Sequence, residues 1–117
     1  MHPALAGAAA AAVWGLAEPL DRRLFRCDYS DVALLARLSG GGRARGFAIH
    51  MANGAVFGLV SRRLCVDPLP LALAEHAALW PLLLLLEPEV ARSPRAFAQG
   101  TFRHALFGAL LGRWATR

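Results

Sequence analysis

Three histidines and one glutamate lie inside otherwise apolar stretches of this 117-residue sequence, namely His50, Glu75, His76 and His104. A charged side chain at the centre of a bilayer costs about 2.5–3.5 kcal/mol on insertion scales, so such residues usually face a helix bundle and find partners there. Carboxylates and imidazoles at such positions can pass protons, and histidines on facing helices can ligate a haem or a metal. These four residues are therefore the first candidates for chemistry.

Glu75 has the strongest need for a partner. It lies about nine residues from the expected helix end at Val66, and His104 lies about ten residues from Trp114, so their depths agree within one turn at about 1.5 Å per residue. Arg103 has nearly the same depth. We predict that Glu75 forms a buried pair with Arg103 or His104. Such a pair could relay protons or ions, or it could be a structural polar lock that sets helix register, and we favour the lock.

No histidine has a second histidine three or four residues away, and Cys27 and Cys65 do not have the spacing of a metal site. If the first two apolar blocks span a membrane, these cysteines lie on opposite sides and cannot pair. The serines lack the context of a catalytic nucleophile. We therefore predict no metal, no cofactor and no enzymatic activity, with haem or metal binding kept as an alternative. The acids Glu18, Asp21, Asp28 and Asp31 are interpreted as helix caps, Asp28 being the expected cap of the next helix, and as partners of arginines.

Small and polar residues form one face of the second apolar stretch. At helical spacing this face comprises His50, Asn53, Gly54, Phe57, Gly58 and Ser61. A matching face on the last stretch comprises Gly100, His104, Gly108 and Gly112. Small residues let helices approach closely, and polar side chains then hydrogen-bond across the contact. We expect these two faces to meet each other, or to meet copies of themselves in an oligomer.

Four apolar blocks must position these residues. A membrane-spanning helix needs about 20 residues, and the blocks predict helices at about 3–20, 46–63, 66–86 and 96–115. Between the first two, the amphipathic segment at about 29–39 is expected to lie flat on the membrane surface. The predicted fold is therefore an all-α membrane bundle of four transmembrane helices with one interfacial helix, in a single domain covering residues 1–117.

Composition agrees with this assignment. Hydrophobic residues make up 56% of the chain, the mean hydropathy is +0.41 and the net charge is +5. All basic residues are arginines, and they lie mainly between the apolar blocks, which favours lipid headgroups over nucleic acid as their partner. On one side of the membrane, the first and third loops carry eight arginines: Arg22, Arg23, Arg26, Arg37, Arg43, Arg45, Arg92 and Arg95. The opposite side of the membrane has four: Arg62, Arg63, Arg113 and Arg117. The positive-inside rule then places both termini outside a multi-pass protein of the cell membrane.

The segments "AEPLDRRLF", "YSDVALL", "HMANGAVFG" and "RHALFGALLG" resemble small uncharacterised four-helix integral membrane proteins of high-GC bacteria. This resemblance implies a membrane location and a four-helix architecture, and it transfers no catalytic residue. The expected function is a structural or accessory subunit that packs with itself or with a larger membrane protein. An alternative function, from a different class of protein, is a proton- or ion-conducting transport unit that uses Glu75, His104 and His50.

Overall fold

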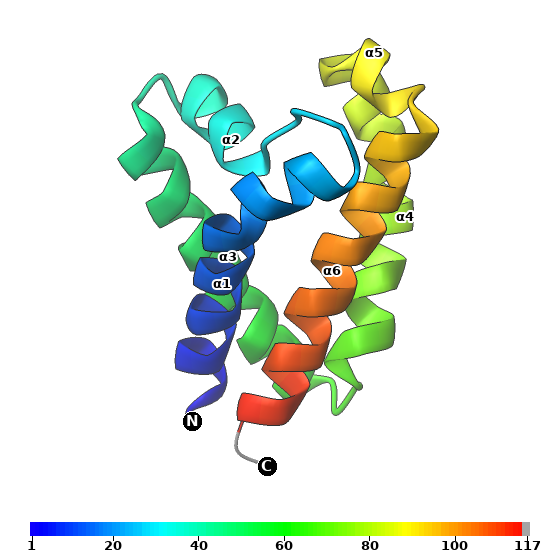
Figure 1. The fold of residues 1–117 in the computed structure, drawn as a ribbon. Helices are drawn as coiled ribbons and strands as arrows, with labels where there is room; N and C mark the ends of the chain where they lie inside the picture. The colour runs from blue at the N-terminus through cyan, green and yellow to red at the C-terminus, as the bar shows by residue number, and fades with distance from the viewer. Residues whose placement is uncertain (116–117) are drawn as a thin grey trace.

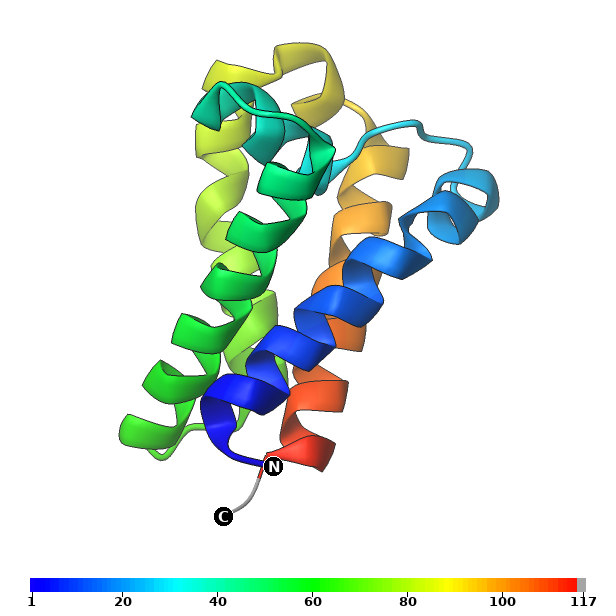
Figure 2. The same ribbon diagram turned by 90° about the vertical axis from the view of Figure 1, so that its left-hand side faces the viewer.

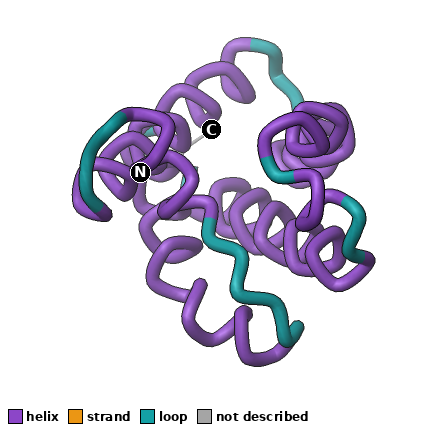
Figure 3. The backbone as a smooth tube through the Cα atoms, turned by 90° about the horizontal axis from the view of Figure 1, so that it is seen from above, coloured by secondary structure: helices purple, strands orange, loops and turns teal. Residues whose placement is uncertain are grey.

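The computed structural model describes residues 1–115 and shows a bundle of four long helices (Figure 1). The long helices are α1 (Pro3–Leu24), α3 (Arg43–Arg63), α4 (Pro68–Leu86) and α6 (Pro94–Trp114). Two short helices, α2 (Asp31–Ser39) and α5 (Pro88–Ala91), lie together at one end of the bundle. Viewed towards that end, the described chain is helix and loop throughout (Figure 3). The all-helical bundle is as predicted. Arg117, one of the arginines counted for the membrane orientation, lies outside the described residues.

Capping residues explain where most helices begin. Asp67 accepts a hydrogen bond from the Leu69 N–H at 3.0 Å and starts α4, and Ser93 accepts one from Ala96 at 3.3 Å and starts α6. In both helices proline follows the cap, where its missing N–H costs nothing. The prediction that Asp28 caps α2 is wrong, because Ser30 holds that position. The four residues of α5 had been expected to form part of a loop.

Helix α1 is longer than predicted and continues through Pro19 to Leu24. Trp14, Glu18 and Asp21 therefore share one helical face at spacings of four and three residues. All three are buried, together with Ala6, Ala10 and Ala11 of the same helix. Of the four acids interpreted as helix caps or arginine partners, Glu18 and Asp21 are thus part of the core.

The long helices form two pairs. In the first pair, α1 packs closely on α3 (Figure 2), because Gly7 and Gly54 bring the two backbones together. A Cβ atom on Gly54 would lie only 2.6 Å from the Ala11 Cβ. In the second pair, α4 packs on α6, where a Cβ on Gly108 would lie 2.7 Å from the Leu69 Cα. The two glycine faces therefore do not meet each other as predicted, because each is covered by its own apolar neighbour.

Contacts between α1 and α6 join the two pairs, whereas α3 and α4 scarcely touch. Of the described helices, α1 and α4 are long and apolar enough to cross a membrane. Helices α3 and α6 have similar lengths but contain more polar residues. The predicted interfacial helix, α2, packs its Val32 and Ala36 against Gly46 of α3.

Candidate functional site

Arg103 of α6 is fully buried and uses all three of its side-chain nitrogens. Its Nε donates to Asp21 Oδ2 at 2.9 Å and its Nη2 donates to Asp21 Oδ1 at 2.7 Å. Nη1 donates to Asp31 Oδ2 at 2.8 Å, and Nη2 also donates to the Tyr29 carbonyl at 2.8 Å. The planar guanidinium matches such two-point bonding to a carboxylate, which makes these hydrogen bonds strong and directional. Arg103 thereby ties α6 to α1 and to the start of α2.

Glu18 extends this cluster towards the N-terminus of α2. Its Oε2 lies 3.5 Å from Arg103 Nη1 and accepts a hydrogen bond from the Asp31 N–H at 3.1 Å. Its Oε1 accepts one from the Ser30 hydroxyl at 2.6 Å, while Ser30 Oγ accepts the Ala33 N–H at 3.1 Å. A carboxylate is favoured at a helix N-terminus because unpaired N–H groups point outward there. The buried acid therefore fixes where α2 begins.

Gln99 completes the cluster one turn before Arg103. Its Nε2 donates to Asp21 Oδ1 at 3.0 Å and to the Cys27 carbonyl at 2.9 Å. We call Glu18, Asp21, Asp31, Gln99 and Arg103 the Arg103 cluster. It combines one cation with three carboxyl groups, and its hydrogen bonds are nearly complete, which is the arrangement expected of a structural lock.

Arg103 was predicted to lie beside Glu75, and it does not. Consecutive residues on a helix point about 100° apart, so Arg103 faces α1 whereas His104 faces α4. The Arg103 cluster itself was missed because the predicted first helix ended at residue 20. A signal was present in the sequence: Trp14, Glu18 and Asp21 continue the alanine face of the same helix, and two acids on a buried face require a cation.

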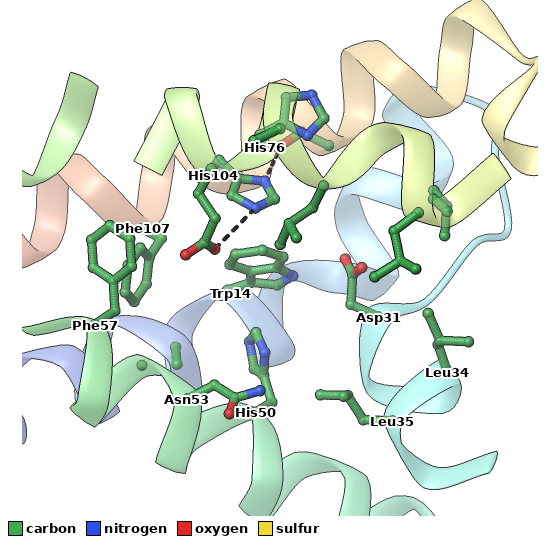
Figure 4. Close-up of a pocket in the computed structure, with 18 of the residues that line it drawn as sticks. Trp14, Asp31, Leu34, Leu35, His50, Asn53, Phe57, His76, His104 and Phe107 are labelled. Carbon is green, nitrogen blue, oxygen red and sulfur yellow. Dashed lines mark hydrogen bonds and ion pairs between the residues drawn. The ribbon is translucent and has the colours of Figure 1, made fainter. Parts of the chain in front are cut away.

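The second feature is a groove between α3 and α4, with a volume of about 820 Å³. We call it the α3–α4 groove. Leucines of α2 and α4 line much of it, and polar groups lie along its floor (Figure 4). The predicted site residues that line it are His50, Asn53, Glu75, His76, Gly54, Gly100 and His104. The groove exists because each glycine face is satisfied within its own helix pair, which leaves α3 and α4 apart.

Four rings follow one another along the floor of the groove. Trp14 lies between His50 and His104, with ring centroids 4.7 Å from each (Figure 4). His76 stacks on His104, also at 4.7 Å. Two buried nitrogens here, Trp14 Nε1 and His50 Nε2, have no hydrogen-bond partner among the described residues. Trp14 thus separates two of the predicted polar candidates and contacts both helix pairs.

Glu75 Oε1 lies 4.0 Å from His104 Nε2, so of the two predicted partners the structure places His104 beside Glu75. The Glu75 side chain is 45% exposed, so this pair lines the groove rather than lying fully buried. His104 Nδ1 is 2.7 Å from the Gly100 carbonyl, an acceptor, so Nδ1 must carry a proton. Nε2 is then the nitrogen that can exchange a proton with Glu75.

The histidines are not arranged as a pair of haem ligands. His76 and His104 stack face to face with ring centroids 4.7 Å apart and an interplanar angle of 29°, which leaves no room for a haem between the two rings. His76 Nε2 is also 3.1 Å from the Thr101 hydroxyl. Among residues 1–115, no group of three or more His, Cys, Asp or Glu side chains could hold a metal ion.

Comparison of the chain with family models, with curated proteins and with solved structures finds no match. The resemblance to small bacterial membrane proteins stays a prediction. Inferences about function therefore rest on the contacts, burial and charges described above.

Proposed function

We propose that this chain is a small multi-pass integral membrane protein, and the exposure of α4 carries the proposal. Its leucines are among the most apolar side chains, yet Leu85 is 80% exposed and Leu79 and Leu82 are each 50% exposed. Exposed leucines also continue on neighbouring faces of the helix, at Leu84 and Leu86. A soluble protein rarely exposes so large a contiguous apolar surface. Lipid would cover α4 on several sides at once.

We extend the proposal to all four long helices. They have 22, 21, 19 and 21 residues, which at about 1.5 Å per residue matches the roughly 30 Å thickness of a hydrocarbon core. The polar residues that lower the hydropathy of α3 and α6 are partly explained by their burial, since His50, Gln99 and Arg103 face the bundle interior. Four spans also agree with the two chain ends lying at the same end of the bundle, where the Met1 amine donates to the Trp114 carbonyl at 2.7 Å.

The arginines support one orientation. The end formed by α2 and α5 collects arginines of the first and third loops, including Arg37, which is paired with Glu87. Because positive loops stay in the cytoplasm, we propose that this end is cytoplasmic and that Met1 and Trp114 lie outside.

Within the membrane we propose an accessory role, performed by binding rather than by catalysis. The observation in its favour is the α3–α4 groove, a preformed apolar recess that opens at the side of the bundle. Such a recess suits a protein that receives a hydrophobic partner from the bilayer.

Fractionation of cells tests the location. We expect the protein to stay with membranes after alkaline carbonate washing and to enter solution only with detergent. Recovery in detergent-free buffer would contradict the membrane assignment. The size of the particle extracted in mild detergent tests the accessory role. We expect it to exceed the size of a single 12.5 kDa chain surrounded by bound detergent. A monomer in every mild detergent would argue against that role.

A second candidate function is proton conduction, and the Glu75–His104 pair favours it. The bond between His104 and Gly100 leaves Nε2 facing the carboxyl, so one proton can move between the two side chains. In proteoliposomes containing a pH-sensitive dye, conduction predicts proton flux above that of empty liposomes and loss of this flux in Glu75→Gln. Glu89→Gln, on the short helix α5, is the matched control. Equal flux in wild type, Glu75→Gln and empty liposomes would overturn this candidate.

A further inference from the structure

We propose that the α3–α4 groove binds a cationic amphiphile, a molecule with a hydrocarbon portion and one ammonium group. The inference rests on the proposed membrane location, because the groove opens sideways and would be filled from the bilayer. It goes beyond that location by giving the charge and shape of the occupant.

The shape of the groove favours a narrow occupant. The lining residues of α4 run from Leu71 to Leu86, which at about 1.5 Å per residue is roughly 22 Å. The groove offers about 820 Å³, within the range of small-molecule sites. A single hydrocarbon chain fits this long, narrow space.

The charge of the groove is one-sided. None of the arginines within residues 1–115 lines the groove, and its two formally charged lining residues in that range are Asp31 and Glu75. Asp31 shares the single positive charge of Arg103 with Asp21 and Glu18. Glu75 has only the imidazole of His104 within salt-bridge distance among the described residues. A carboxyl group in an apolar groove that lacks a cationic partner selects a positively charged ligand and disfavours an anionic one.

Aromatic rings add to this preference. Trp14, Phe57 and Phe107 line the groove, and Figure 4 shows them near His104, the residue that lies beside Glu75. A cation near an aromatic face is attracted by the ring quadrupole, most strongly by that of tryptophan. Carboxylate and rings together suit an ammonium head, while the leucines of α2 and α4 suit the hydrocarbon portion.

Equilibrium binding to protein in lipid nanodiscs tests the proposal. The probes are radiolabelled dodecyltrimethylammonium and dodecyl sulfate, which have the same chain and opposite charge, and uptake by empty nanodiscs is subtracted. We expect saturable binding of the ammonium probe and none of the sulfate. Glu75→Gln should weaken ammonium binding by about tenfold or more, because it removes the negative charge that attracts the quaternary ammonium within an apolar groove of low dielectric constant. Glu89→Gln, on α5 and away from this groove, should bind like wild type.

A second variant keeps the test decisive if Glu75→Gln misfolds. Ala78 lines the groove and is exposed, so Ala78→Trp should fill the groove and abolish binding without altering Glu75. Equal binding of the two probes, or unchanged ammonium binding in both variants, overturns the proposal. So does a dimer by light scattering that Ala78→Trp converts to a monomer without any ammonium binding, because the occupant is then a second copy. None of these results contradicts the membrane location, which carbonate extraction tests separately.

Discussion

Arg103 on α6 and Asp21 on α1 are joined by two hydrogen bonds, of 2.9 and 2.7 Å, although 82 residues separate them in the chain. Both side chains are 1% exposed. This pair lies where the two helix pairs meet, so it connects α1 and α3 on one side with α4 and α6 on the other.

Replacing Arg103 by Met should be strongly destabilising. The buried carboxyl groups of Glu18 and Asp21 would remain without their cation, and breaking a buried ion pair from one side costs about 3–5 kcal/mol. We expect a matching fall in the free energy of unfolding in detergent, followed by helical circular dichroism. Arg103→Lys should be intermediate, because it keeps the charge and loses the two-point geometry. Arg95→Met, at an exposed position of the same helix, is the control. A similar loss in Arg95→Met and Arg103→Met would contradict the structural role of the Arg103 cluster.

Gly54→Ala should loosen the contact between α1 and α3. The new methyl group would meet Ala11 Cβ at 2.6 Å as well as the backbone of Gly7, and overpacking of this kind costs about 1–3 kcal/mol. The same substitution at Gly112, where the nearest atom is a ring carbon of Pro68 at 3.3 Å, should be near neutral. Thermal unfolding of the two variants in one detergent makes the comparison. If the Gly112 variant were the less stable, the assigned packing of α3 on α1 would be wrong.

The single tyrosine offers a pH experiment. Burial, followed by the negative charge of Asp31, raises the pKa of Tyr29 above its usual range. Because folding favours the neutral phenol, its contribution to stability is complete below about pH 10, the usual pKa of tyrosine, and is lost as the pH rises towards the raised value. Ultraviolet titration should therefore show no phenolate near pH 10 while the protein is folded. Tyr29→Phe should remove the signal, and an ordinary phenolate titration in the folded protein would contradict the burial.

The two cysteines test the topology. Cys27 follows α1 and Cys65 follows α3, so they lie at opposite ends of the bundle, and both are free thiols. In intact cells, a membrane-impermeant maleimide should label Cys65 in the Cys27→Ser variant. In the Cys65→Ser variant, Cys27 should react only after solubilisation in a denaturing detergent. Labelling of Cys27 alone in intact cells would reverse the orientation, and labelling of both would contradict the spanning arrangement.

The sequence was sufficient to predict the four long helices because each contains a long apolar block, and three of them begin at a proline. The observed bounds of α3 and α4 differ from the predicted ones by two or three residues. It was harder to predict which helix packs on each glycine face. Glycine faces on α3 and α6 have matching spacing, but spacing alone does not distinguish a contact between them from contacts with α1 and α4.

The candidate site was predicted in part for a similar reason. Depth along two helices correctly brings Glu75 near His104, because depth depends only on residue counts and the helical rise. It cannot separate His104 from Arg103, which differ by rotation about the helix axis. The Arg103 cluster also required knowing that α1 continues past Pro19, a residue that usually interrupts a helix.

The fluorescence of Trp14 should report on the contact between the two helix pairs. Its ring contacts His50 of α3 and both His104 and Phe107 of α6, while its buried indole N–H has no hydrogen-bond acceptor among the described residues. An indole in a dry surrounding without a hydrogen bond emits fluorescence at short wavelength, and admission of water shifts that emission to the red. Trp80, by contrast, already donates to the Ala91 carbonyl at 2.9 Å. The colour of Trp14 emission is therefore an intrinsic gauge of how closely the two helix pairs stay together.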